Sequence, residues 1–381
     1  MPAGSILDFD QDHPVEDISG IGVSGGGYRA AVFHAGAFYR FNELGLLKGL
    51  SRISSVSGGS ITAGALAVAW PALQWGAGNR AGNLDQKFLK PLLRQVRSTV
   101  DIGAGLSRFN PFTSPAKQAA ESYDENFCGG LHLDQLPKPP NAPLFIINAT
   151  SLMTGRNVRF RHDMVADYSV GVVKGLRVKL SAAVAASAAF PPFLSPALLS
   201  MAGGRIEAGT EGGNAIGKML EEWLLTDGGV YDNMGTETIW KRCRTLFISN
   251  AGRPFEVQED PPTDLVYQPI RVIDLVMAQA EALRNRILAH AYLTGARKGA
   301  MWSLTTGQDN PDDRPPMLSE AEYRAAQQVP TRLSAMDDAT INLLLKAGYA
   351  HACSRLRRHF GPGQGGVPDI PDGHPPRAIP T

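Results

Sequence analysis

The sequence has few cysteines, no excess of charge of either sign and no long apolar run. Its three cysteines lie far apart, so neither a disulfide framework nor a cysteine metal site is indicated. Lysine and arginine number 37 against 36 acidic residues, a balance that argues against a nucleic-acid-binding protein. No stretch approaches the ~18 uninterrupted apolar residues of a membrane-spanning helix, and residues 1–17 lack the apolar core of a signal peptide. We therefore expect a soluble, cytoplasmic protein whose only membrane contact is peripheral.

Apolar periodicity predicts alternating strands and helices. Hydrophobic residues make up 43% of the 381 residues, which is enough for one large domain. Short buried strands are expected at residues 18–23, 53–56, 144–151, 223–226 and 246–249. Helices are expected at residues 28–47, 58–70, 180–189, 236–242, 269–293 and 337–359. Strands linked by helices through short connections indicate an α/β domain with a central, mostly parallel sheet flanked by helices.

A glycine run, Ser-Gly-Gly-Gly-Tyr-Arg at residues 24–29, connects the first expected strand and helix. Glycines leave their N–H groups uncovered, and a helix N-terminus favours negative charge, so this turn is a candidate site for a phosphate or an oxyanion. The residues also contain G-x-G-x-x-A (Gly25, Gly27, Ala30). Dinucleotide binding, however, needs an acidic residue after the second strand, and Ser57 stands there instead. We therefore disfavour dinucleotide binding.

A candidate nucleophile, Ser57, follows the second expected strand. A nucleophilic serine on a sharp strand-to-helix turn needs small residues two positions before and after it. Gly59 meets the second requirement, and Ser55 replaces the usual glycine at the first. An ordinary loop or helix cap is the alternative interpretation. The connection between the first two strands is expected to be right-handed, so this turn and the glycine run should share one carboxyl edge of the sheet.

A candidate base, Asp227, follows the short apolar strand at residues 223–226 and precedes two glycines. At the carboxyl edge of the sheet, a carboxylate with a raised pKa could accept the proton of an attacking serine hydroxyl. A simple Asp-Gly turn is the alternative. Asp232 and Asn233 are expected to support this loop as turn and hydrogen-bonding residues.

These motifs together resemble the patatin-like phospholipase family. The resemblance is carried by Gly-Gly-Gly-x-Arg at residues 25–29, Ser-Gly-Gly from residue 57, Ala-Ala-Ser-Ala-Ala-Phe-Pro-Pro at 185–192 and Asp-Gly-Gly from residue 227. The Ser-Gly-Gly-Gly-Tyr-Arg form is similar to the bacterial and cytosolic-phospholipase-like members. The resemblance implies a three-layer sandwich related to α/β hydrolases. It also implies the following site residues: Ser57 as nucleophile, Asp227 as its partner, and Gly25, Gly26 and Gly27 as the oxyanion hole.

Arg29 matches the arginine of the family motif. The resemblance implies contact with a lipid phosphate, and a structural arginine in the first helical turn is the alternative. The catalytic domain is expected to span residues 1–360, with the motifs within residues 18–235 and a helical part at about 269–359. Residues 361–381, rich in glycine and proline, are expected to form an unstructured tail.

A serine–aspartate dyad is favoured over a triad that includes histidine. None of the eight histidines lies in a strand-end loop beside a further motif, and His34, near the glycine run, is the best candidate for an indirect role. Acyl transfer of this kind needs no metal or organic cofactor. No clustered acidic loop indicates a calcium site.

The expected function is hydrolysis of fatty-acyl esters of phospholipids or lysophospholipids. Two alternatives stay open: a hydrolase of soluble esters or thioesters with the same dyad, and a non-catalytic phosphate-binding module. Residues 190–194 and 102–112 could line a groove for an acyl chain, and arginines at 284–286 and 355–358 could attract anionic headgroups. The sequence does not indicate an oligomeric state.

Overall fold

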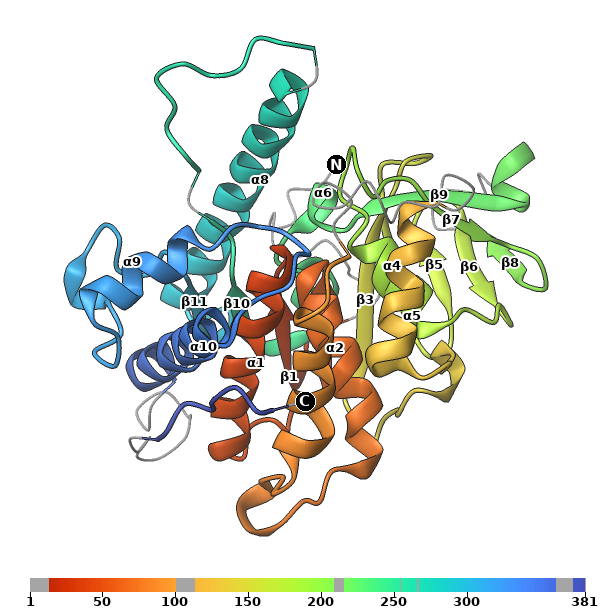
Figure 1. The fold of residues 1–381 in the computed structure, drawn as a ribbon. Coiled ribbons are helices and arrows are strands. Elements are labelled where there is room, and N and C mark those ends of the chain that lie inside the picture. Colours follow the sequence, from red (N-terminus) through yellow and green to blue (C-terminus); the bar gives the residue numbers. More distant parts are fainter. Residues whose placement is uncertain are drawn as a thin grey trace.

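A mixed β-sheet forms the centre of the molecule (Figure 1). The computed structural model describes residues 14–100, 114–208, 216–253, 255–265, 267–360 and 373–380. Within these residues, the sheet has the strand order β11-β10-β1-β2-β3-β4-β5-β6-β8, and β9 pairs with β3 and β7. The strands are β1 (Glu16–Val23), β2 (Arg52–Val56), β3 (Leu144–Ser151), β4 (Asn157–Phe160), β5 (Val165–Asp167), β6 (Gly171–Lys174), β7 (Ala197–Ser200), β8 (Arg205–Ala208), β9 (Glu222–Asp227), β10 (Cys243–Asn250) and β11 (Lys298–Ser303).

The predicted fold class, an α/β fold with a central, mostly parallel sheet flanked by helices, is confirmed. Strands β11, β10, β1, β2 and β3 run parallel to one another. Their apolar residues are buried on both faces, as the continuous apolar runs predict. From β3 outward the pairing is antiparallel, through β4, β5, β6 and β8. The sequence patterns do not predict these four short strands.

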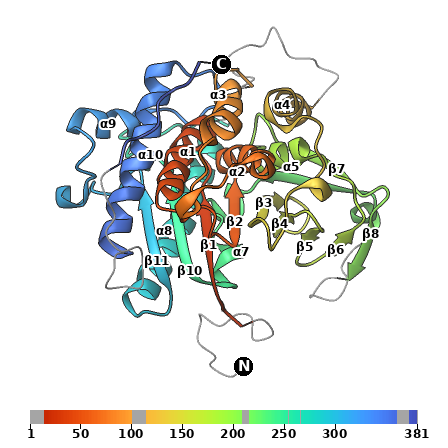
Figure 2. The ribbon, with the colours of Figure 1, turned by 90° about the horizontal axis from the view of Figure 1, so that it is seen from below.

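Helices cover both faces of the sheet. Figure 2 shows α1, α2, α3, α4, α5 and α10 together on one side of the strands. On the opposite face, Met234, Ile239 and Leu288 pack against Leu246 and Ile248 of β10 in a second apolar cluster. The helices are α1 (Gly27–Glu43), α2 (Gly58–Ala69), α3 (Lys90–Val96), α4 (Pro115–Tyr123), α5 (Leu180–Ser187), α6 (Gly229–Asp232), α7 (Glu237–Trp240), α8 (Tyr267–Leu293), α9 (Glu320–Gln328) and α10 (Asp338–His359).

The C-terminal part differs in two ways from the expectation. Strand β11 (Lys298–Ser303) lies where the sequence predicts mostly helix, and it extends the parallel sheet beside β10. Residues 373–380, within the expected unstructured tail, lie along the protein surface instead. There the N–H of Ala378 donates to Oδ1 of Asn342 at 2.7 Å, and Arg97 donates to the carbonyl of Ile379 at 3.0 Å. A chain rich in glycine and proline forms no regular element, but its backbone can still bond to an existing surface.

Helix length was also compared with the requirement for crossing a bilayer. Across the part of the chain that the structure describes, no helix combines sufficient length with sufficient apolar character to span a membrane.

Candidate active site

Ser57 occupies a strained turn between β2 and α2. Its φ of 51° and ψ of −119° form a positive-φ conformation that is rare outside glycine. The backbone N–H of Ser57 donates to Oγ of Ser187 at 2.9 Å, and the residue is 8% exposed. A strained strand-to-helix turn is the setting in which nucleophilic serines are found.

The Ser57 turn lies directly against the glycine run. A β-carbon at position 58 would stand 2.0 Å from the carbonyl oxygen of Gly27, so only glycine fits there. The N–H of Gly59 donates to the carbonyl of Ser24 at 3.1 Å. The structure therefore brings together the two turns that flank the first strand–helix–strand unit.

The pairing that places Asp227 near Ser57 is one that the sequence does not predict. Strand β9 is antiparallel to β3, and Asp227 pairs with Ala149, whereas Val56 pairs with the preceding residue, Asn148. Strand β4 occupies the other edge of β3 at these positions. Thus β2 and β9 lie end to end along one edge of β3, with their carboxyl ends facing each other. Asp227, expected at the carboxyl edge of the sheet, lies at the carboxyl end of β9 and faces the carboxyl end of β2, although β9 runs antiparallel to β3.

The Asp227 carboxyl is buried, and the Ser57 hydroxyl influences its pKa. The residue is 3% exposed, and the N–H of Gly229 donates to Oδ1 at 2.7 Å. Burial raises the pKa of Asp227 to about 6, although the hydrogen bonds from Gly229 and Ser57 lower it in part. A carboxyl group with this pKa is largely ionised at neutral pH and can accept a proton from the hydroxyl beside it.

The three glycines differ in what their N–H groups do. That of Gly25 donates to the carbonyl of Asn233 at 3.0 Å, so Gly25 has no free donor for an oxyanion, contrary to the expectation. For Gly26 and Gly27, no described residue accepts a hydrogen bond from the N–H group. Gly26 has a φ of 135° and Gly27 begins α1, so these two donors lie at a helix N-terminus.

Arg29 is buried beneath the glycine run. It is 1% exposed, and it donates from Nε to the carbonyl of Ala251 at 3.0 Å and from Nη1 to that of Val329 at 2.9 Å. Burial lowers its pKa to about 10. This geometry favours the structural alternative for Arg29 over contact with a lipid phosphate, because two of its donor groups already bond to backbone carbonyls.

The loop after Asp227 is held in place by α8. Asp232 accepts from the hydroxyl of Thr236 at 2.8 Å and lies 3.5 Å from Nε of Arg284. Asn233 donates to Glu281 at 3.3 Å. The supporting role expected of Asp232 and Asn233 agrees with these contacts. Sequence reasoning missed Glu281, since an acidic residue within a long helix usually faces solvent.

His34 lies under the site without touching the dyad. Its Nε2 donates to the carbonyl of Ser24 at 2.9 Å, so Nδ1 accepts from Oγ of Ser249 at 2.8 Å. Burial lowers its pKa to about 3, and the ring is therefore neutral. Among the described histidines, none bonds to Ser57 or Asp227, so the geometry corresponds to a two-residue arrangement.

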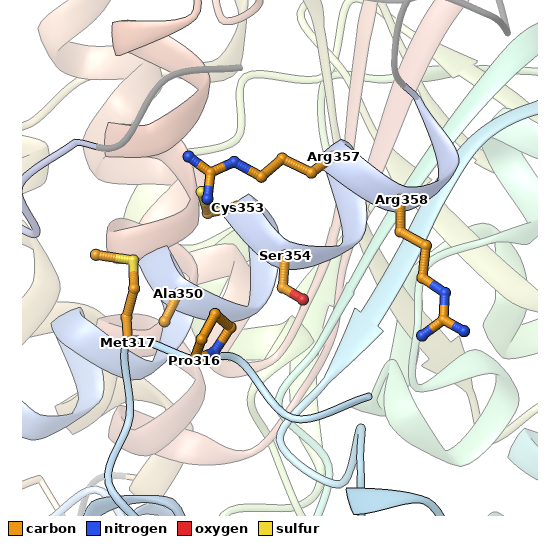
Figure 3. A pocket seen from close by; sticks show the side chains of 7 residues that line it. All are labelled: Pro316, Met317, Ala350, Cys353, Ser354, Arg357 and Arg358. Carbon is orange, nitrogen blue, oxygen red and sulfur yellow. The ribbon is translucent and has the colours of Figure 1, made fainter. Parts of the chain in front are cut away.

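Metal ligands and cavities were sought elsewhere in the described residues. Within them, no group of three His, Cys, Asp or Glu side chains could hold a metal ion. A cavity of about 290 Å³ lies beside α10, away from the residues named above, and Arg357 and Arg358 extend to different sides of it (Figure 3). Its lining residues are Pro316, Met317, Ala350, Cys353, Ser354, Arg357 and Arg358.

On an α/β fold, a serine in a strained turn and a buried aspartate thus stand at facing strand ends, beside the amides of Gly26 and Gly27 at a helix N-terminus. A family model for the patatin-like phospholipases matches residues 23–240, more than half of the chain. The chain therefore belongs to the patatin-like phospholipase family.

One solved structure, with a TM-score above 0.5, supports the fold and nothing more. The chain is similar to human GIVD cytosolic phospholipase A2, with 13% identity and a TM-score of 0.52 over 88% of this chain and 58% of that one. A match to VipD from Legionella pneumophila has 15% identity and a TM-score of 0.37, and it covers 90% of this chain and 67% of VipD. The chain thus spans little more than half the length of the human protein. No curated protein matches it.

Proposed function

We propose that this protein hydrolyses fatty-acyl esters of phospholipids or lysophospholipids through a Ser57–Asp227 dyad. The observation that carries the proposal is that Ser57 and the buried Asp227 stand at the facing ends of β2 and β9 on neighbouring positions of β3, where burial raises the pKa of Asp227 to about 6. Such a carboxyl accepts a proton more readily than an exposed aspartate and still remains mostly ionised at neutral pH. Family membership supports the lipid ester as substrate.

Acylation begins with attack of the Ser57 oxygen on the ester carbonyl, while Asp227 takes the hydroxyl proton. The N–H groups of Gly26 and Gly27 stabilise the oxyanion, and each such donor typically contributes about 3 kcal/mol to transition-state stabilisation. The tetrahedral intermediate collapses when the bond to the alcohol breaks. Asp227 then gives its proton to the leaving alkoxide. The products of this step are an acyl-Ser57 ester and the free alcohol or lysolipid.

Deacylation repeats these steps with water as the nucleophile. Asp227, ionised again, removes a proton from water as its oxygen attacks the acyl-Ser57 carbonyl. The same amides hold the second oxyanion. Its collapse releases the fatty acid, and the proton on Asp227 returns to the Ser57 oxygen. Each cycle therefore consumes one ester and one water molecule, and the dyad ends in its starting state.

Contact with a lipid surface is part of the proposal, and helix α8 is its best candidate. Five apolar side chains of α8, each at least 41% exposed, recur at helical spacing: Val272, Leu275, Val276, Leu283 and Ile287. The helix is joined to the loop after Asp227 through Arg284 and Asp232, and in Figure 1 it projects from the body of the molecule. We expect Leu283→Asp to weaken co-sedimentation with phospholipid vesicles. The matched control is Leu198→Asp, which changes an exposed leucine on β7. Equal co-sedimentation of both variants would remove α8 from the proposal.

The other segments expected to contact lipid give less support to this part of the proposal. Residues 102–112 lie outside the described residues, whereas Phe193 of the 190–194 segment is 53% exposed. Arg284 pairs with Asp232, and Arg355 and Arg358 both pair with Asp313, so these arginines already have acidic partners. A cytoplasmic location with peripheral membrane contact remains a prediction.

The two alternative functions give different results in one experiment. Release of fatty acid and lysolipid from phospholipid vesicles is measured for the wild type, Ser57→Ala and Asp227→Asn. The proposal predicts release by the wild type alone. Turnover of short esters or thioesters without fatty-acid release would indicate the soluble esterase, and no turnover of any ester would exclude both enzymes.

A further inference from the structure

We propose that Ser187, supported by Ser60 and Ser55, is a positioning residue that holds the Ser57 backbone in its reactive conformation. The inference rests on the proposed function, because it assigns a role in the reaction of Ser57. Ser187 is the last residue of α5 and lies in the segment at 185–192 that resembles the family pattern. Its side chain is 0% exposed, so it is shielded from a substrate and would act through Ser57.

The hydroxyl of Ser187 is completely used by its neighbours. It donates its single proton to the carbonyl of Asn148 at 2.6 Å and accepts the N–H of Ser57 at 2.9 Å. Oγ of Ser60 lies 2.9 Å away on the remaining side of this hydroxyl, and the single proton of Ser60 is shared between Oγ of Ser187 and Oγ of Ser55. Ser187 is 0% exposed, so water does not compete for these contacts.

The chain of hydroxyls continues to Ser55. Oγ of Ser60 lies 3.0 Å from Oγ of Ser55, which donates to the carbonyl of Ile146 at 3.2 Å. Both side chains are 0% exposed. Position 55 is where a nucleophile turn usually has glycine. Here a serine is accommodated because its hydroxyl joins the network that leads to the N–H of Ser57.

The same end of α5 also holds the loop that carries Asp227. The carbonyl of Ser187 accepts the N–H of Gly228 at 3.1 Å, and the carbonyl of Ala189 accepts the N–H of Asp227 at 2.9 Å. Ser187 therefore bonds to Ser57 through its hydroxyl and to Gly228, the residue after Asp227, through its carbonyl. Only the first contact depends on the side chain, so a substitution can remove it selectively.

The positive-φ conformation of Ser57 gives this contact its importance. Such a conformation persists only where surrounding groups hold it. The hydrogen bond to Oγ of Ser187 holds the backbone N–H of Ser57 itself. Without an acceptor, the buried N–H would favour a shift of the turn toward another partner. A shift of about 1 Å in a reacting group can reduce a rate by about 100-fold.

The test compares Ser187→Ala with Ser181→Ala in the full-length protein. Ser181 lies on the same helix, is 2% exposed and influences Asp124 instead of Ser57, so it is a matched control. The readouts are the second-order rate of fluorophosphonate modification at Ser57, kcat and KM on a short ester, and the melting temperature. We expect Ser187→Ala to lower the modification rate and kcat by about 10- to 100-fold with KM little changed. Ser181→Ala should react like the wild type.

Further variants keep the test decisive. Ser60→Ala removes the hydroxyl that lies 2.9 Å from Oγ of Ser187, so its rate should fall between those of the wild type and Ser187→Ala. This variant replaces Ser187→Ala as the test if the latter does not fold. A Ser187→Ala or Ser60→Ala protein that folds and reacts at the wild-type rate would overturn the inference, as would an equal loss in Ser181→Ala. If the wild type itself does not react, the proposed function fails instead.

Discussion

Ser57 and Asp227 stand at the facing ends of two strands that share one edge of β3. Strand β2 pairs with β3 as far as Asn148, and β9 pairs with it from Ala149 onward in the opposite direction. The separation of the two side chains is therefore set by the backbone register of a single strand. A dyad built in this way needs no loop closure to assemble.

The activity should depend on a group that titrates near pH 6. Burial raises the pKa of Asp227 to about 6, and only the ionised carboxylate can take the proton of Ser57. Below this pH, kcat/KM on a soluble ester should fall by about tenfold per pH unit. The measurement is a pH–rate profile, with circular dichroism to confirm that the protein stays folded. A profile that is flat well below pH 6 would contradict the role of Asp227 as base.

The same burial predicts that Asp227 reduces stability at neutral pH. Its pKa is raised from 3.8 to about 6 on folding, so the folded state binds the proton more tightly than the unfolded state does. The native chain consequently loses stability as pH rises through this window. We expect Asp227→Asn to increase the free energy of unfolding at neutral pH by about 1–3 kcal/mol, because it removes a buried charge.

Urea unfolding of the wild type and Asp227→Asn at several pH values provides the measurement. The stability difference should shrink as pH falls from about 6 toward 3.8, because the Asp227 carboxyl then becomes protonated in the folded state and, at the lower end, in the unfolded state as well. An asparagine variant that is less stable than the wild type at neutral pH would show that the carboxylate is well stabilised in the fold.

Close contact between the two turns predicts that position 58 accepts only glycine. A β-carbon there would meet the carbonyl of Gly27 at 2.0 Å, so Gly58→Ala must separate the turns. We expect a loss of about 1–3 kcal/mol in stability and of most activity. Gly82→Ala is the control, because no atom lies within 4 Å of a β-carbon at that position. Equal behaviour of the two variants would contradict the contact.

Arg29 offers a test that separates structural support from substrate binding. Lysine cannot bond at once to the carbonyls of Ala251 and Val329, so Arg29→Lys should lose about 1.5–3 kcal/mol of stability. Activity should fall by the same factor on a neutral ester and on a phospholipid. Rates on both substrates and thermal unfolding give the measurement. A loss confined to phosphate-bearing lipids would instead assign Arg29 to the substrate.

The sequence predicts the contact between Ser57 and the glycine run for a physical reason. Both turns follow strands of one right-handed strand–helix–strand unit, so their common edge follows from topology. For Asp227, the sequence identifies the residue but not the direction of its strand. A short apolar segment such as residues 223–226 is compatible with either direction, and pairing with β3 decides it.

Other features depend on tertiary contacts that no local pattern encodes. The burial of Arg29 follows from Ala251 and Val329, which lie more than 200 residues away in the chain. The acceptor for the N–H of Gly25 is likewise provided by the distant Asn233. Ser187 gave a weak local signal, as the single hydroxyl among alanines at residues 185–189. Its importance becomes visible only with the position of Ser57.

The most direct test of the dyad is to locate the residue that a fluorophosphonate modifies and to compare its rate in two proteins. Peptide mapping by mass spectrometry identifies the modified residue in the wild type and in Asp227→Asn. The account predicts a covalent adduct on Ser57 in the wild type and, without the base, modification slower by at least about 100-fold. An adduct on a different residue, or equal rates in the two proteins, would contradict it.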